Sequence, residues 1–142
     1  MGIMTQEEKA MTQIDKLAWL AIRDRRLLCV RSHGKTLFYI PGGKRDPGES
    51  DQAALLREIT EELTVRLSPA SLRLAGDFEA QADGKQAGVR VRLRCFFGEG
   101  EGTPTPAAEI AELAWLTSQD SHRLSPSAAL VMAWLRQQDL ID

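Results

Sequence analysis

The segment PGGKRDPGESDQAALLREITEELTV, residues 41–65, carries the clearest structural signals in the chain. Its opening Pro41-Gly42-Gly43 ends the apolar run before it, as glycine and proline commonly do between elements. Ser50 is a typical helix N-cap, and Asp51 places negative charge at the positive end of a helix dipole. We therefore expect a loop after the glycine pair and then a helix that begins near Asp51 and ends at about Leu63.

The expected helix has two different faces. At about 100° per residue, one arc gathers the apolar side chains Leu55, Leu56, Ile59 and Leu63. A second arc holds Glu58, Glu61 and Glu62 within roughly 100° of one another. Like charges at these spacings cost about 0.2–0.5 kcal/mol per pair, which Arg57 relieves in part through Glu61 at i+4. On composition alone this is a solvated surface, but the spacing also permits a Mg²⁺ site.

The flanking sequence predicts strands on both sides of the helix. Before it, two apolar runs separated by the polar group 23–26 suggest a hairpin, and residues 37–40 a short strand. After it we expect strands at 72–78, 89–97 and 109–116, a Gly/Thr/Pro loop at 98–106 and a final helix at 126–138. This order of elements indicates a mixed sheet with helices packed on it. Residues 1–13 lack periodicity and are expected to form a tail, and residues 14–142 a single domain.

Composition and charge narrow the classes of function. The chain has 142 residues, a net charge of −2 and 43% hydrophobic residues, enough for a real core. This balance argues against a partner that is polymeric nucleic acid, which calls for a basic excess. No apolar run is long enough to span a membrane, and the N-terminus lacks an apolar signal core, so we expect a cytoplasmic protein. Cys29 and Cys95 lie in apolar surroundings and are expected to be reduced thiols.

The spacing of the charged positions resembles the Nudix box. Gly43 is followed after five residues by Glu49, and after seven more by Arg57-Glu58-Ile59-Thr60-Glu61-Glu62-Leu63-Thr64-Val65. The preceding Phe38-Tyr39-Ile40-Pro41-Gly42-Gly43 also resembles the lead-in of many members of that family. Only Thr64 departs from the specified positions of the box, which have glycine there. A glycine at this point serves a left-handed helix stop, and a β-branched residue resists that backbone by about 1 kcal/mol or more.

The resemblance implies a fold and a set of roles. The implied fold is α/β, the Nudix fold, with a mixed β-sheet sandwiched between α-helices. Glu58, Glu61 and Glu62 would ligate one or more Mg²⁺ ions, for which Mn²⁺ can substitute, together with the backbone carbonyl of Gly42. Arg57 would hold the carboxylates in place through hydrogen bonds, with Glu49 as its partner.

Other residues are candidates for the base and for the substrate site. The general base is a glutamate of the box or one from a later loop, and Glu109 is the candidate there. Arg31, Lys44 and Tyr39 are candidate substrate contacts, although each taken singly fits a surface cation or a core aromatic. Three arginines, Arg90, Arg92 and Arg94, share one face of a strand, either the wet side of a sheet or a cleft wall for phosphates.

The implied activity is Mg²⁺-dependent hydrolysis of the diphosphate linkage in a nucleoside diphosphate derivative by a monomer or homodimer. Candidate substrates include ordinary or oxidised nucleoside triphosphates, sugar nucleotides, ADP-ribose and dinucleoside polyphosphates, and the short chain favours the triphosphates. Two alternatives stay open: a catalytically silent nucleotide-sensing module, and an enzyme similar to isopentenyl-diphosphate isomerase. The second alternative needs a catalytic cysteine in the pocket.

Overall fold

The computed structural model describes residues 3, 5 and 12–142, so most of the expected tail at residues 1–13 lies outside the described residues. The strands are β1 (Gln13–Leu20), β2 (Ile22–Arg23), β3 (Arg26–Ser32), β4 (Gly42–Gly43), β5 (Arg66–Leu67), β6 (Arg73–Gln81), β7 (Arg90–Phe97), β8 (Gly100–Glu101) and β9 (Ile110–Leu116). The α-helices are α2 (Asp51–Leu63) and α3 (Pro126–Gln137), and 3-10 turns cover Pro69–Ser71 and Ser118–Arg123.

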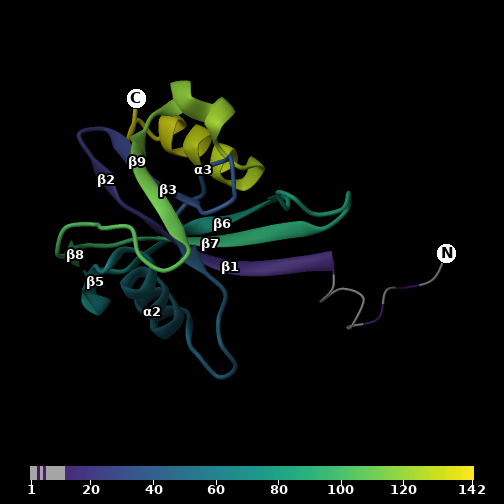
Figure 1. Cartoon of the computed structure of the whole chain (residues 1–142), viewed down its shortest axis with the longest axis horizontal. Helices are drawn as coiled ribbons and strands as arrows, with labels where there is room; N and C mark the ends of the chain where they lie inside the picture. Colours follow the sequence, from purple (N-terminus) through teal and green to yellow (C-terminus); the bar gives the residue numbers. More distant parts are fainter. Residues whose placement is uncertain (1–2, 4, 6–11) are drawn as a thin grey trace.

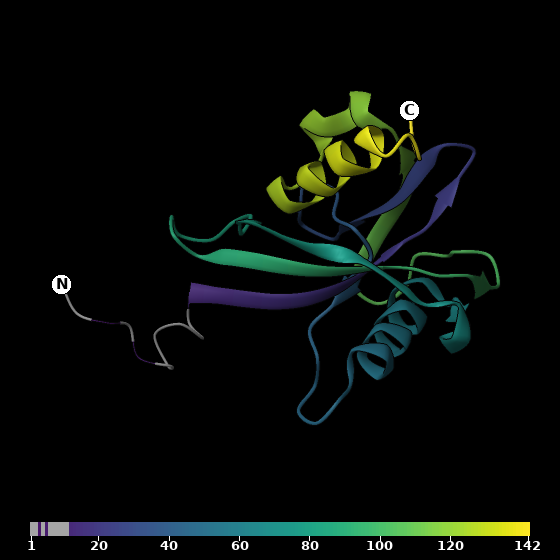
Figure 2. The ribbon, with the colours of Figure 1, turned by 180° about the vertical axis from the view of Figure 1, so that it is seen from behind.

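The strands form one mixed sheet and two antiparallel ones. The largest has the order β4-β1-β7-β6, in which β1 runs parallel to β7 and the other pairs are antiparallel. A second sheet has the order β2-β3-β9, and β5 pairs with β8. Helix α2 lies on one side of the sheets and α3 on the other (Figure 1, Figure 2). This is the expected sandwich of a mixed sheet between helices.

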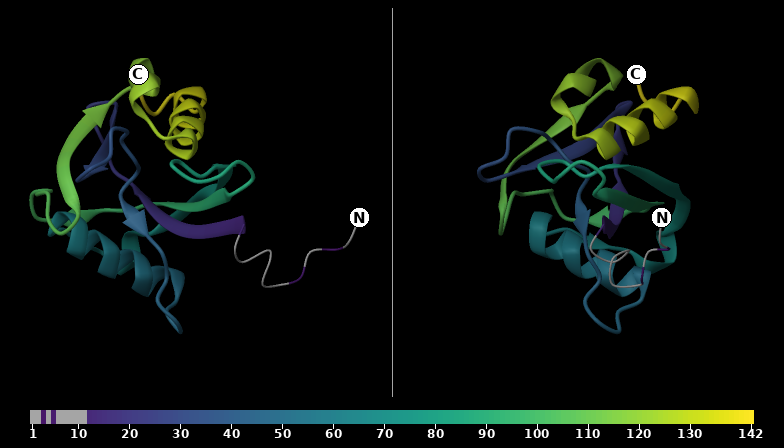
Figure 3. Two further views of the ribbon diagram at one scale, coloured as in Figure 1. Left: turned by 45° about the vertical axis from the view of Figure 1, so that its right-hand side comes forward. Right: turned by 90° about the vertical axis from the view of Figure 1, so that its right-hand side faces the viewer.

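Each helix packs on its own hydrophobic core. On the α2 side, Leu55, Ile59 and Leu63 are fully buried, together with side chains of β1 and β3. On the other side, Val131, Met132 and Leu135 of α3 are equally buried. Helix α3 itself lies against β6 and β7 (Figure 3). The alternation of strand side chains divides the two cores, because successive residues point to opposite faces. The expected reduced thiols, Cys29 and Cys95, are both free and buried.

The expected hairpin is present, but it is shorter than the two apolar runs. Strands β2 and β3 pair through Ile22 and Leu27, and the turn residues Asp24 and Arg25 both have positive φ, as two-residue hairpins favour. The first apolar run breaks at Ala21, and the part before it, β1, pairs instead with β7 and β4. Within the described residues, neither helix is long and apolar enough to cross a membrane.

Two expectations about local structure need correction. Residues 37–40 form two isolated bridges rather than a strand, because Tyr39 pairs with Val30 of β3 while Phe38 pairs with Leu124 on another segment. Residues 37–40 therefore do not form a continuous hydrogen-bonded ladder with one partner strand. The expected loop at residues 98–106 contains the short strand β8, which pairs with β5 just after α2.

Candidate active site

Helix α2 begins where its capping residues predict. The Ser50 hydroxyl accepts a hydrogen bond from the Ala53 N–H at 3.1 Å. The Asp51 carboxylate pairs with Arg45 from the preceding loop and lies 3.0 Å from an Nη of Arg94 on β7. These contacts tie the start of the helix to the large sheet, so that the glutamates further along the helix are held in a fixed place.

The helix ends in the left-handed conformation that the box position requires, although the residue there is threonine. Thr64 has φ 57° and ψ 25°, and its N–H donates to the Thr60 carbonyl at 3.0 Å. The turn that glycine makes in the family pattern is therefore retained, with the strain that a β-branched residue carries in this region.

The glycine pair of β4 brings the backbone against the helix. Strand β4 pairs with β1, and the Gly42 N–H donates to Glu62 Oε1 at 2.8 Å. A Cβ on Gly42, whose φ is 148°, would lie 1.9 Å from the Leu17 carbonyl oxygen. A Cβ on Gly43 would lie 2.4 Å from the Glu58 carboxyl carbon. No side chain fits at either position without displacing its neighbours.

Arg57 organises the carboxylates around it. Its Nε and one Nη each lie 2.8 Å from an oxygen of Glu49, in a bidentate pair, and the other Nη lies 3.0 Å from Glu58. The guanidinium also donates to the Lys44 carbonyl at 3.0 Å. Hydrogen bonds from Arg57 hold the pKa of Glu49 down to about 2. The structure thus brings Arg57 and Glu49 together, as the resemblance to the Nudix box implied.

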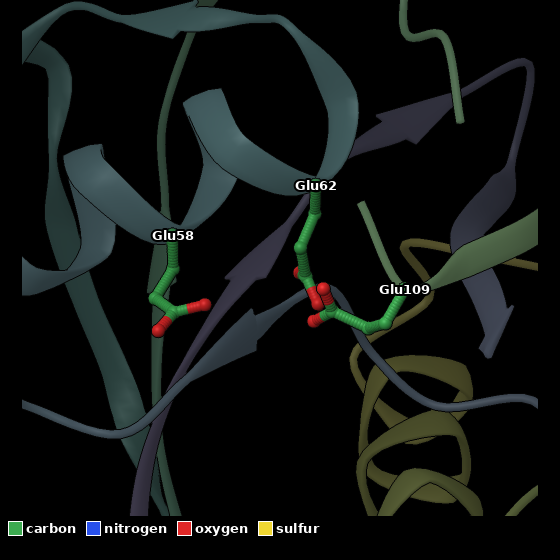
Figure 4. A group of neighbouring side chains, drawn as sticks. All are labelled: Glu58, Glu62 and Glu109. Carbon is green, nitrogen blue, oxygen red and sulfur yellow. The ribbon is translucent and has the colours of Figure 1, made fainter. Parts of the chain in front are cut away.

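Three carboxylates converge beside the glycine pair. One oxygen from each of Glu58, Glu62 and Glu109 lies within 4.8 Å of the others (Figure 4). Glu109 reaches this place because the loop before β9 is bonded to the end of α2. The Ala107 N–H donates to the Glu62 carbonyl and the Thr105 N–H to that of Leu63, both at 2.9 Å.

The electrostatics of this group call for a cation. Burial raises the pKa of Glu62 to about 8, aided by the neighbouring charges of Glu109 and Glu58, while the Gly42 N–H acts in the opposite direction. Burial also raises the pKa of Glu58, against the effect of Arg57. Converging carboxylate oxygens are the donor set that Mg²⁺ and Mn²⁺ prefer, so these residues fit a divalent metal.

Glu61 lies apart from this group. Its side chain is 52% exposed, and one carboxylate oxygen lies 3.4 Å from Arg57. The group of three found among the described residues contains Glu109 instead of Glu61. The role of Glu61 as a metal ligand stays a prediction.

The carboxylates line one end of a cavity of about 390 Å³. Two of the candidate substrate contacts, Tyr39 and Lys44, also line it, but Arg31 is not among the lining residues. The Arg31 guanidinium lies 2.6 Å from Glu112 on β9 and donates to the Lys35 carbonyl at 2.9 Å. Glu112 and Arg31 thus form an ion pair between β9 and β3. A substrate contact by Arg31 stays a prediction.

Further lining residues were not singled out from the sequence. They include Lys16 on β1 and Asp83 on the β6–β7 turn, whose carboxylate accepts a hydrogen bond from the Tyr39 hydroxyl. Burial and that carboxylate raise the pKa of Tyr39 well above its usual range. Lys16 alternates with Ile14 and Ala18 on the inward face of its strand, a signal that identifies an inward cation once the strand is known.

The arginines of β7 lie away from the cavity. Arg90 pairs with Glu79 at 3.3 Å and Arg92 with Asp15 at 3.0 Å, while Arg94 joins Asp77 at 2.9 Å as well as Asp51. The cavity is lined by the alternate residues Val91 and Leu93. Of the two interpretations of this face, the structure supports the wet side of a sheet.

Solved structures share this fold at low sequence identity. A NUDIX hydrolase from Nitrosomonas europaea matches with a TM-score of 0.70 and 16% identity, over 91% of each chain. The MutT NUDIX hydrolase from Burkholderia pseudomallei matches with a TM-score of 0.65 and 20% identity, over 89% of this chain and 97% of that one. The E. coli ORF135 protein gives a TM-score of 0.65 and 24% identity, over 92% of this chain and 96% of that one.

A family model decides the assignment. No curated protein matches the chain. The model described as the NUDIX domain matches residues 15–135, well over half of the sequence. That range includes the glycine pair, the carboxylate helix, Glu109 and most of α3. Members of this family generally hydrolyse nucleoside diphosphate derivatives with the help of divalent metals. The chain belongs to the Nudix family.

Proposed function

We propose that the protein is a Mg²⁺-dependent pyrophosphohydrolase that cleaves the diphosphate linkage of a nucleoside diphosphate derivative. One observation carries the proposal: Glu58, Glu62 and Glu109 converge at one end of a cavity that is also lined by lysines. Such a cavity offers oxygen ligands to a metal and positive charge to a phosphate. The metal fits the carboxylates, and the lysines fit the oxygens of the substrate.

Each residue has a physical role in the proposed reaction. Glu58 and Glu62 would hold the metal, with Glu61 and the Gly42 carbonyl as further proposed ligands. When bound, the ion neutralises diphosphate charge and lowers the pKa of coordinated water. Arg57 positions Glu58 by hydrogen bonding, and Glu109 accepts a proton from the attacking water. Lys44 and Tyr39 lie where they can contact the substrate.

Within this class we propose nucleoside triphosphates, ordinary or modified, as the substrates, with pyrophosphate as one product. Four lysines of the described residues line the cavity: Lys16, Lys35, Lys44 and Lys85. They form no ion pair among the described residues, so their charge is available to a polyanionic ligand. A triphosphate uses this charge more fully than a diphosphate linked to a neutral group.

A substrate panel tests this function. Purified protein is incubated with nucleoside triphosphates, sugar nucleotides, ADP-ribose and dinucleoside polyphosphates, with Mg²⁺, with Mn²⁺ or with EDTA. We expect metal-dependent release of pyrophosphate from at least one triphosphate. Release from another class alone would replace the triphosphate proposal, and no release from any compound would favour the nucleotide-sensing alternative.

The isomerase alternative receives no support from the positions of the thiols. Cys29 and Cys95 are both 0% exposed, and neither lines the cavity. Burial raises the pKa of each thiol to about 12, so the reactive thiolate is disfavoured. We expect both cysteines to be replaceable by alanine without loss of hydrolysis.

A further inference from the structure

The cavity extends along β1, from the carboxylates to an apolar end. At one end, Leu17 pairs with Gly43, beside Glu58. Three residues away, Ile14 pairs with Val91 of β7. At about 3.3 Å per residue, the two ends are separated by about 10 Å along the strand. Ile14, Val91 and Ala82 line the far end, which therefore suits the less polar part of a ligand.

Lys16 lies between these ends on the floor of the cavity. It pairs in register with Leu93 of β7, and its ammonium lies 5.9 Å from the centre of the Tyr39 ring. Lys16 is the only half-buried lysine of the four that line the cavity, since the other three are exposed. Its position thus differs from that of a rim cation, which water can solvate.

Within the part of the chain that the structure describes, the ammonium of Lys16 has no partner of opposite charge. Among the described residues it makes no ion pair and no side-chain hydrogen bond, whereas every arginine on the other face of β7 has a carboxylate partner. Burial and Lys44 lower the pKa of Lys16, against the attraction of Glu62 and Glu58. A half-buried, unpaired cation that faces a cavity indicates an anionic group of a ligand.

We propose that Lys16 binds the phosphate that adjoins the nucleoside of the substrate, and that it still holds this phosphate in the nucleoside monophosphate product. The inference rests on the proposed function, which places the cleaved linkage at the carboxylates. The apolar end then takes the nucleoside, and the group between them, beside Lys16, is the first phosphate. Lys16 is accordingly a determinant of substrate binding that needs no metal to act.

Metal-free binding tests this role without any turnover. AMP, GMP, CMP and UMP, and the four corresponding nucleosides, are titrated by calorimetry in EDTA into the wild-type protein. We expect at least one monophosphate to bind about 10-fold or more tightly than its nucleoside, as a charge-assisted hydrogen bond allows. In Lys16→Met this preference falls to about 2-fold or less, and Lys16→Arg retains most of it.

Two further variants control for a general effect of charge and for loss of folding. Arg66→Met removes one positive charge from an exposed pair with Glu101, and neither residue lines the cavity, so this variant keeps the wild-type preference. Lys16→Gln keeps a polar end on an uncharged side chain that is one atom shorter, and it replaces Lys16→Met if thermal unfolding shows that the methionine variant is not folded.

Two results would overturn the inference. One is a wild-type protein that binds each nucleoside as tightly as its monophosphate, and the other is a folded Lys16→Met or Lys16→Gln that keeps the preference. Neither result depends on hydrolysis. The proposed function fails instead in the substrate panel, so the two failures are distinguishable.

Discussion

Positive charge is matched differently on the outer face of β7 and in the cavity. On the face of β7 toward α2, the arginines each lie within 3.3 Å of a carboxylate. In the cavity, the four lysines form no ion pair among the described residues. The acids of the cavity gather with one another instead. Charges that pair within the protein support the fold. Unpaired lysines and clustered carboxylates in one cavity indicate an anionic ligand and a metal.

The largest effect is expected from Glu62, which lines the cavity. Glu62→Gln should lower kcat by at least about 100-fold at saturating Mg²⁺ with the fold intact, because it removes a charged metal ligand. Steady-state pyrophosphate release measures this. The matched control is Glu79→Gln, because the pair of Glu79 with Arg90 is exposed, and its kcat should stay within about 2-fold. Near-normal turnover in Glu62→Gln would rule out the ligand role.

The unmatched acids should also make the metal-free protein sensitive to pH. The pKa of Glu62 is raised to about 8 in the folded protein, against about 4.5 for the same carboxyl in the unfolded chain. The protonated group therefore contributes its full stability below about pH 4.5, and this contribution is lost as the pH rises toward 8. Between pH 6 and pH 8 the free energy of unfolding should fall by about 2 kcal/mol from this group. Urea unfolding in EDTA measures it.

Two comparisons define this pH effect further. Saturating Mg²⁺ should remove most of the fall, because the ion favours the ionised carboxylate. Glu62→Gln should remove it without metal. An equal fall in that variant would show that another group is responsible.

Exchanging one cation in the cavity and one on β7 should separate binding from stability. Lys44→Met should raise KM about 5-fold with unfolding unchanged, because its ammonium forms no ion pair among the described residues. Arg94→Met should leave KM unchanged and lower the free energy of unfolding by about 1 kcal/mol, because Asp51 and Asp77 lose a shared partner. Kinetics and urea unfolding of both variants check this. The contrast between the cavity and β7 fails if both variants change KM, or if both change the free energy of unfolding.

The smallest effect concerns the backbone strain at Thr64, which lies outside both regions. Thr64→Gly should stabilise the protein by about 0.5 kcal/mol, since relief of the left-handed backbone, worth about 1–2 kcal/mol, exceeds the entropy cost of a glycine. Thermal unfolding measures the gain, and kcat should not change. A loss of stability would mean that the bond from the Thr64 hydroxyl to the Leu63 carbonyl, 2.6 Å long, outweighs the strain.

Local signals predicted the carboxylate helix and its surroundings well. The bounds of α2 follow from Ser50 and from the turn at Thr64, which act through neighbouring residues. The mixed α/β fold followed from the order of elements and from the resemblance to the Nudix box. The pairing of Arg57 with Glu49 also lies within one short segment.

What the sequence did not predict depends on distant pairing. Lys16 enters the cavity because β1 lies parallel to β7, more than seventy residues away. No local sequence pattern predicts that register. The ion pair of Arg31 with Glu112 likewise depends on the pairing of β3 with β9, which joins residues 81 positions apart. Residues 37–40 read as a strand, but their two halves bond to different segments.

The glycine pair of β4 sets a limit on how this pocket can evolve. A Cβ at Gly42 would overlap the Leu17 carbonyl, and a Cβ at Gly43 would overlap the Glu58 carboxylate. At both positions only one residue type is compatible with the fold and with the carboxylates together. Tyr39 and Asp83, which meet across the cavity from separate segments, are under no such backbone constraint. New substrate preferences can therefore arise at the recognition end while the chemical end stays unchanged.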